Sequence, residues 1–193
     1  MKKRLNLFEI LGIGLILVSL GLILFLRISA ASAEASAADT AAKMEALLPP
    51  PKAGIPGMYA DPAMPVLQLD GTDYVALLKV PGYGVTLPVA DEWSNEPIIS
   101  CPARYYGSVY DNTMLIGGTD QQGQFDFFTR MEPGDSIEIM DMLGSEFSYT
   151  VDRIDRAKSV DYEKLSSGGY PLTLFVRSSH APEFILVRCT FGS

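Results

Sequence analysis

Two runs near the end of the chain, Pro171–Arg177 and Glu183–Arg188, restrict its fold more than any other part of the sequence. Both are rich in β-branched and aromatic residues, which favour extended strands. The five residues that separate them are mostly small or polar and end in a proline, as in a turn. The two runs therefore predict adjacent antiparallel strands. The residues expected to form their buried part are Leu174, Phe175, Ile185 and Val187.

From about residue 72 onward the sequence consists of short β-prone runs separated by turn signals such as Pro81-Gly82 and Leu143-Gly144. Further strands are expected at Tyr74–Val80, Tyr83–Val89, Thr113–Gly118, Ser136–Met140 and Phe147–Val151. One helical turn is expected within Asp91–Ser100, a short aromatic helix or turn at Gln124–Phe128, and a short helix at Asp161–Leu165. Seven or eight strands at this spacing predict a mostly β fold, either a small barrel or a sandwich.

The N-terminal segment has a different texture. Lys2, Lys3 and Arg4 precede an uncharged run from Ile10 to Leu26, whose seventeen residues are at the short end of what a membrane-spanning helix needs. Ala31-Ser32-Ala33 would suit signal-peptide cleavage, but Arg27 directly after the apolar run favours an uncleaved anchor. The expected topology is a single pass through the cell membrane with a cytoplasmic N-terminus and an extracellular C-terminal domain.

Three regions are therefore predicted: a basic end and membrane anchor over 1–27, an extracytoplasmic spacer over 28–70, and a β domain over 71–193. The spacer is rich in Ala, Ser and Pro. Helix propensity favours a helix over Ala33–Leu48, and the prolines from Pro49 onward end it.

Charge and composition exclude several function classes. The whole chain has a net charge of −8, and because residues 1–27 carry +3, the rest carries −11. Such an acidic domain repels nucleic acid, so no nucleic-acid partner is expected. Cys101, Cys189 and His180 are the only cysteines and histidine, and their spacing fits no metal site, so neither a metal nor another cofactor is expected. Two buried free thiols are favoured over a disulfide.

Four segments in the same order resemble the sortase family. Val80–Val89 is similar to the family's opening segment, and Asn112–Gly117 is similar to its Asn-Thr-Val-Ile-Ala-Gly-His segment. Phe125–Asp135 follows as the family's Phe…Leu…Gly-Asp run does, and Leu172–Val176 fits the strand that carries the nucleophile. The match covers about residues 74–190. It implies an eight-stranded β-barrel with short helices, behind an anchor and spacer of the kind found in Gram-positive cell-surface sortases.

The resemblance also implies that the catalytic residues are absent. Sortases cut a sorting-signal peptide through a cysteine thioester, with a histidine that moves protons and an arginine that donates hydrogen bonds. The corresponding positions hold Gly118, Arg177 and Phe184. Neither glycine nor phenylalanine supplies this chemistry, and a protonated guanidinium is no nucleophile. We therefore expect no catalytic residues at these positions.

Other residues offer weak substitutes. Cys189 lies five positions after Phe184, so a regular strand would point it to the opposite face. His180 and Glu183 lie in or beside the final loop and, with Arg177, are the possible ligand-binding residues. Arg177 is expected either to pair with an acid, namely Asp120, Asp126 or Glu183, or to bind a ligand carboxylate or phosphate.

The resulting functional prediction is a degenerate, membrane-anchored sortase-like protein. It would act as an accessory module in surface-protein or pilus anchoring, with a sorting-signal peptide, a pilin-like protein or an active sortase as its partner. Two alternatives remain open. One is an active cysteine transpeptidase or hydrolase that uses a relocated thiol, and the other is a structural envelope protein.

Overall fold

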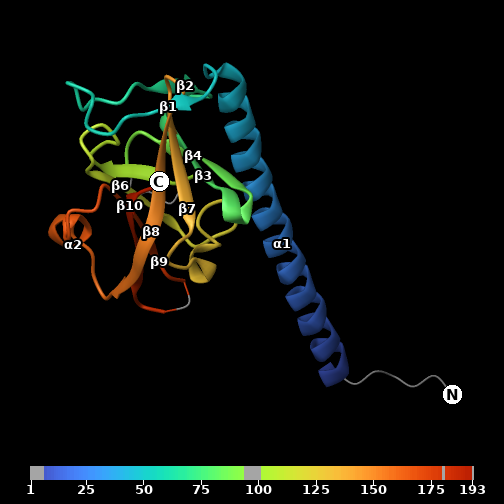
Figure 1. Ribbon diagram of the computed structural model, residues 1–193. Coiled ribbons are helices and arrows are strands. Elements are labelled where there is room, and N and C mark those ends of the chain that lie inside the picture. Colours follow the sequence, from blue (N-terminus) through green and yellow to red (C-terminus); the bar gives the residue numbers. More distant parts are fainter. Residues whose placement is uncertain (1–6, 94–100, 180, 193) are drawn as a thin grey trace.

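The computed structural model describes residues 7–93, 101–179 and 181–192, and for 7–10 the backbone only. The described part contains ten strands in one sheet (Figure 1). The strands are β1 (Lys52–Ala53), β2 (Leu67–Leu69), β3 (Thr72–Val80), β4 (Val85–Ala90), β5 (Ala103–Tyr106), β6 (Met114–Thr119), β7 (Ser136–Asp141), β8 (Ser145–Ala157), β9 (Leu172–Arg177) and β10 (Phe184–Phe191). The helices are α1 (Leu7–Leu47) and α2 (Tyr162–Ser166), with 3₁₀ turns η1 (Pro81–Tyr83) and η2 (Phe128–Arg130).

Eight of these strands close into a barrel. The order is β8-β10-β9-β6-β5-β4-β3, and β7 closes the ring because it pairs with both β3 and β8. Most neighbours are antiparallel, whereas β4 with β5 and β6 with β9 are parallel. β1 and β2 lie outside the ring, on β8 and β3 respectively. The expected eight-stranded barrel is thereby confirmed, and the sandwich is excluded.

The barrel interior is a single apolar core because alternate residues of each strand point inward. On β9 these are Leu172, Leu174 and Val176, and on β10 they are Ile185, Val187 and Cys189. Leu174, Phe175, Ile185 and Val187 are all buried, in strands that pair antiparallel as predicted. Phe175 belongs to a separate cluster on the outer face, beneath α2.

All seven predicted strands are present, with boundaries that differ by at most six residues. The clearest difference is at β8, which continues to Ala157 instead of ending at Val151. The helix expected at Asp161–Leu165 forms as α2, whose first turn is capped by the Asp161 carboxylate accepting from the Lys164 N–H at 2.8 Å. The turn expected within Asp91–Ser100 falls mostly outside the described residues. The sequence reading missed β1, β2 and β5, which are short.

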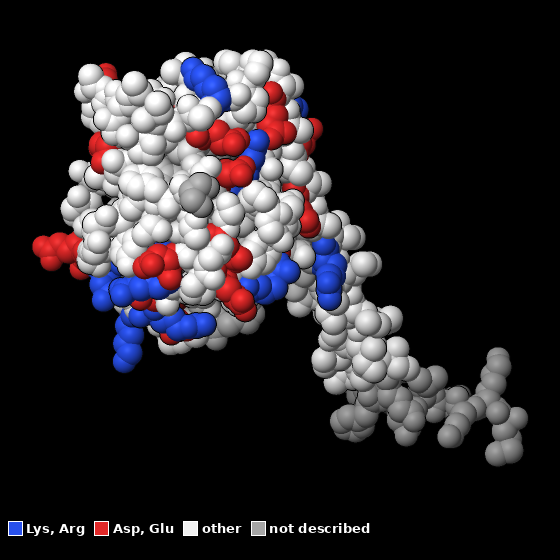
Figure 2. Space-filling model, viewed as in Figure 1, with Lys and Arg blue, Asp and Glu red and all other residues white. Residues whose placement is uncertain are grey.

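The N-terminal helix α1 is one continuous element of 41 residues (Figure 1). Its apolar side chains from Leu11 to Ile28 are exposed, and the helix is long and apolar enough to cross a membrane. An apolar surface of this size is unfavourable in water and suits a membrane anchor. Figure 2 shows this part of the helix as an uncharged rod that extends away from the barrel.

The second half of α1 packs against the barrel. Ala37, Ala41 and Met44 are buried between the helix and the barrel. Lys79 on β3 forms ion pairs with Glu45 of the helix at 3.5 Å and with Glu146 of β8 at 3.9 Å. The segment expected to be a spacer therefore contributes to the packing of the domain. Sequence alone did not indicate this, because an Ala-rich helix offers small contact surfaces that a hydrophobicity pattern does not reveal.

Candidate functional site

Two of the three family catalytic positions lie side by side at one end of the barrel. Arg177 ends β9 and is paired with Phe184, which begins β10, and on its other side Arg177 is paired with Thr119 of β6. The loop between β9 and β10 is closed by the Ser178 N–H, which donates to the Glu183 carbonyl at 2.9 Å. The register thus brings together the two positions that the resemblance assigned to the cysteine and the arginine.

The position assigned to the histidine is oriented differently. Gly118 pairs with Val176 and therefore lies one residue before Arg177 along the strands. A Cβ atom at Gly118 would lie 2.7 Å from the Phe125 ring, inside normal contact distance. Phe125 is fully buried in the core. A histidine at this position would therefore require the core to rearrange.

Arg177 is exposed at the barrel end. Of the acids expected to pair with it, Glu183 instead forms an ion pair with Arg156. Asp120 accepts hydrogen bonds from Ser179, from its N–H at 2.5 Å and its hydroxyl at 2.9 Å. Across the described ranges, no ion pair joins Arg177 to an acid. The guanidinium thus presents its donors to solvent, whereas Glu183 is engaged. His180, the third predicted ligand-binding residue, lies outside the described residues.

Both thiols are free and buried. Cys189 is fully buried inside the barrel, on the face opposite Phe184, as predicted from strand alternation. Burial raises its pKa strongly. Burial also raises the pKa of Cys101 to about 11, although the hydrogen bond with the backbone of Ala90 opposes that shift. Neither sulfur is therefore a thiolate at neutral pH, and the thiolate is the nucleophilic form.

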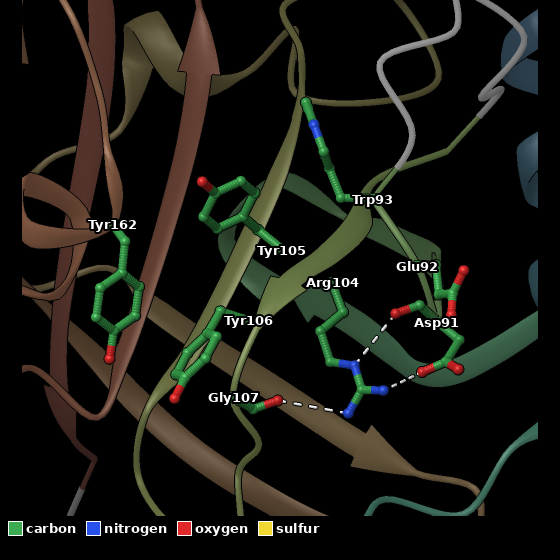
Figure 3. A pocket seen from close by; sticks show the side chains of 8 residues that line it. All are labelled: Asp91, Glu92, Trp93, Arg104, Tyr105, Tyr106, Gly107 and Tyr162. Carbon is green, nitrogen blue, oxygen red and sulfur yellow. Dashed lines mark hydrogen bonds and ion pairs between the residues drawn. The ribbon is translucent and has the colours of Figure 1, made fainter.

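A cleft of about 730 Å³ opens on the outer face of the barrel. Figure 3 shows the side chains that line it. They are Asp91, Glu92 and Trp93 after β4, Arg104–Gly107 on and after β5, and Tyr162 on α2. The volume is in the usual range for ligand sites. These residues were not predicted from the sequence, although the aromatic run Arg104-Tyr105-Tyr106-Gly107 could have indicated a binding surface.

Aromatic rings form the walls and floor of the cleft. The Tyr106 and Tyr162 rings meet edge to face at 4.6 Å between centroids, one from β5 and one from α2. Tyr105 stands edge-on to Phe175 at 5.5 Å, and Trp93 contacts both rings at 6.2 and 5.6 Å. Tyr105, Tyr106 and Tyr162 keep 38%, 48% and 45% of their surface exposed, which leaves them accessible to a ligand.

The floor requires a glycine. A Cβ atom at Gly117 of β6 would lie 2.4 Å from Trp93 and 2.6 Å from Phe175. Phe175 and Arg177 are two residues apart on β9, so they share its outer face and lie roughly 7 Å apart along the strand. The aromatic cleft and the exposed Arg177 thus belong to the same surface of the barrel.

Polar contacts hold the cleft in shape. Arg104 forms an ion pair with the Asp91 carboxylate and donates to the Asp91 carbonyl at 3.2 Å (Figure 3). A hydrogen bond with the Tyr106 side chain is the main cause that raises the pKa of Tyr162. The Tyr162 hydroxyl is therefore neutral at physiological pH. Glu92 is exposed at the rim and gives the cleft an acidic side.

A buried arginine fixes α2, and with it the wall of the cleft. Arg188 on β10 is only 1% exposed. Its guanidinium donates to the carbonyls of Leu165 and Lys164, the latter at 2.7 Å, and to the Thr173 hydroxyl at 3.2 Å. Because α2 has only five residues, these bonds rather than intrinsic helix stability hold Tyr162 in place.

The comparisons with known proteins agree with this architecture. No family model matches the sequence, and no curated protein matches it. Among solved structures, sortase A from Corynebacterium diphtheriae matches with a TM-score of 0.54 and 22% identity over 63% of this chain. Sortase C from Clostridium perfringens matches at 0.53 and 18% over 63%, and sortase C1 from Streptococcus suis at 0.52 and 20% over 62%.

The chain spans 62% of the Corynebacterium structure, 71% of the Clostridium structure and 73% of the Streptococcus structure. At these identities the similarity concerns the fold. In this chain, the closed eight-stranded ring, the parallel pairing of β6 with β9 and the final antiparallel pair form the framework on which the cleft is built. The protein therefore has the sortase fold.

Proposed function

We propose that this protein is a membrane-anchored, non-catalytic sortase-like module that binds an extended peptide in its aromatic cleft. Its partner would be a sorting-signal peptide, which could belong to a pilin-like protein, or else an active sortase. The domain would face the outside of the cell, with α1 as a single-pass anchor. The role would be accessory, in surface-protein or pilus anchoring.

The proposal that the protein is non-catalytic rests on the residues that occupy the three positions assigned to catalysis by the sortase resemblance. Thioester chemistry needs a thiolate beside a proton-transferring base and a donor for the developing negative charge. Gly118, Arg177 and Phe184 supply none of these in the required form. The cross-strand pairing of Arg177 with Phe184 supports the assignment of the positions themselves.

The alternative of an active enzyme with a relocated thiol finds little support. Cys189 is enclosed by the barrel core, and Cys101 is buried in a second cluster against α1. A peptide carbonyl would have to enter the core to reach either sulfur. Since burial raises the pKa of both thiols, the reactive thiolate would also be scarce.

The peptide-binding part rests on the cleft. Exposed tyrosine rings that converge from β5 and α2 provide flat apolar faces with hydroxyl groups at their ends. Such surfaces recognise proline-containing extended segments, because a preformed extended backbone loses little entropy on binding. A sorting signal of the Leu-Pro-x-Thr-Gly type has a proline of this kind. The acidic rim at Glu92 would favour a peptide with basic flanking residues.

The test is binding of a fluorescent Leu-Pro-x-Thr-Gly peptide to the full-length protein in detergent, followed by anisotropy. Tyr106→Ala and Tyr162→Ala should each weaken binding about two- to tenfold, the range expected for one aromatic contact. Phe191→Ala is the matched control, because Phe191 is 47% exposed and lies on the far part of β10, away from the cleft.

Absence of binding by the unmodified protein would favour the structural alternative instead. In that case the packing of Trp93 over Gly117 and Phe175 would serve to close the outer face of the barrel.

A further inference from the structure

The continuity of α1 has a consequence for where the barrel sits. The apolar run ends at Leu26, Arg27 follows, and the helix continues without interruption to Leu47. Ala33 and Glu34 already touch the barrel, because a Cβ atom at Gly123 would lie 3.0 Å from their backbone atoms. Six residues of helix span about 9 Å, and a lipid headgroup layer is about 5–7 Å thick. Little space therefore remains between the barrel and a bilayer.

One particular end of the barrel faces that bilayer. Gly123 belongs to the segment 119–130 that follows β6. Thr119 at its start pairs with Arg177, Arg177 with Phe184, and Phe184 with Ala157 of β8. These strand ends form one rim. Figure 1 shows this rim, below the β9 label, on the side toward which the N-terminal half of α1 extends.

The same rim carries basic side chains that form no ion pair within the described part of the protein. Arg130, Lys158 and Arg177 are exposed, and none of them forms an ion pair with a described acid. Arg130 lies in η2, and its guanidinium carbon is 5.5 Å from the centroid of the Tyr83 ring. Lys158 directly follows β8. Figure 2 shows Lys and Arg side chains gathered at this lower end, with acidic side chains beside them.

These observations fit a phospholipid surface. Guanidinium and ammonium groups bind headgroup phosphates, and each basic residue near an anionic leaflet adds to membrane attraction. Because α1 tethers the barrel to the bilayer, the rim is already at the height of the headgroups. Weak contacts from each basic residue are therefore enough to keep the rim on the membrane surface.

We propose that the barrel rests on the membrane through the rim formed by residues 119–130, 177–179 and 181–184, with Arg130, Lys158 and Arg177 contacting headgroup phosphates. The anion held by Arg177 is then a lipid phosphate. The proposal rests on α1 as the membrane anchor, and it leaves the aromatic cleft on the side wall open to a peptide.

Fluorescence quenching on the full-length protein in nanodiscs tests this placement. An environment-sensitive thiol label is attached at Gln122→Cys or Thr129→Cys on the rim, and at Leu143→Cys in the β7–β8 turn at the opposite end as the control. All three positions are exposed, whereas the native thiols are buried. Spin-labelled headgroups should quench the two rim labels several-fold more than the label at 143. Equal quenching at both ends would overturn the proposal.

The basic contacts are tested by comparing phosphatidylglycerol-containing nanodiscs with pure phosphatidylcholine nanodiscs. Anionic lipid should increase rim quenching, and Arg177→Gln should reduce that increase about fivefold, as expected for one basic side chain at an anionic surface. Lys52→Gln, on β1 at the other end, is the matched control and should change nothing. Equal effects of both substitutions, or no effect of Arg177→Gln, would contradict the assigned contacts.

Failure of the chain to insert into nanodiscs would refute the anchor, and with it this proposal, without bearing on peptide binding. Insertion with rim quenching but no peptide binding would support the membrane contact and contradict the cleft function. The two proposals are therefore separable on one preparation.

Discussion

Arg177 at the end of β9 lies directly across from Phe184 at the start of β10. In a sortase, by the sequence resemblance, these two places hold the nucleophilic cysteine and the catalytic arginine. Here a cation and an aromatic ring occupy them, and Thr119 is the residue beside Arg177 on β6. On the assignment that the resemblance implies, the sortase fold would be kept without the groups that perform the chemistry.

The first prediction concerns activity. The unmodified protein should not cleave quenched fluorescent peptides of the Leu-Pro-x-Thr-Gly type above background, because no thiolate and base are paired at the family positions. Arg177→Cys alone should remain inactive, since Gly118→His and Phe184→Arg would be needed with it. Turnover that a thiol-blocking reagent or Cys189→Ala abolishes would show that a relocated cysteine works.

Restoring activity should also have a structural cost. Gly118→His should destabilise the domain, because even its Cβ would come within 2.7 Å of the buried Phe125 ring. Overpacking of this kind typically costs about 1–3 kcal/mol. Urea unfolding followed by Trp93 fluorescence measures the change, and the additional substitution Phe125→Leu should recover part of the loss. An unchanged midpoint of urea unfolding in Gly118→His would show that the core around Phe125 rearranges without loss of stability.

The final strands should dominate stability. Leu174 is fully buried in the barrel core, so Leu174→Ala should lower the free energy of unfolding by roughly 2–5 kcal/mol. Leu143→Ala is the control, because Leu143 is 49% exposed and its loss should matter little. Similar effects of the two substitutions would contradict the observed core.

Arg188 should be essential for the cleft wall. Replacing it by alanine leaves the Leu165 and Lys164 carbonyls without their donor, and the expected loss is about 3 kcal/mol or more. Lysine should not rescue it, since one ammonium cannot reproduce the guanidinium geometry. Arg153→Ala, at an exposed ion pair, should change stability by less than about 1 kcal/mol. Peptide binding should weaken together with stability only in the Arg188 variants.

Alkaline pH should expose the effect of thiol burial. Burial raises the pKa of the Cys101 thiol from its ordinary value of 9.0 to about 11, so the folded protein holds this proton more tightly than the unfolded chain. Its stabilising contribution is therefore complete below about pH 9 and is lost as pH rises toward 11. Unfolding free energies at pH 7, 9 and 11 should fall less steeply in Cys101→Ala. Parallel curves for the two proteins would exclude this contribution.

The topology can be checked on intact cells that lack a wall. Added protease should remove the domain from about residue 50 onward, because Lys2, Lys3 and Arg4 favour a cytoplasmic N-terminus. Complete protection of the domain would reverse the orientation. A mature mass that corresponds to cleavage after Ala33 would show a secreted protein in place of an anchored one.

Local sequence patterns were sufficient to predict the class of the fold. Strand alternation and turn residues are local properties, so the runs at Tyr74–Val80, Ser136–Met140 and the final pair predicted real strands with nearly correct ends. The order of similar segments indicated the sortase fold, and the same resemblance assigns glycine, arginine and phenylalanine to the family's catalytic positions. The burial of Cys189 opposite Phe184 also followed from alternation alone.

The surroundings of those residues could not be predicted from local patterns and follow from the folded barrel. The aromatic cleft joins Trp93, Tyr105 and Tyr162 from three segments far apart in sequence, and no local pattern encodes their meeting. The same holds for the ion pair that removes Glu183 from Arg177 and for the buried Arg188 beneath α2. The docking of α1 depends on small residues and on one close approach at Gly123. Contacts of this kind depend on strand register and barrel closure, because these set the distances between side chains that the sequence places far apart.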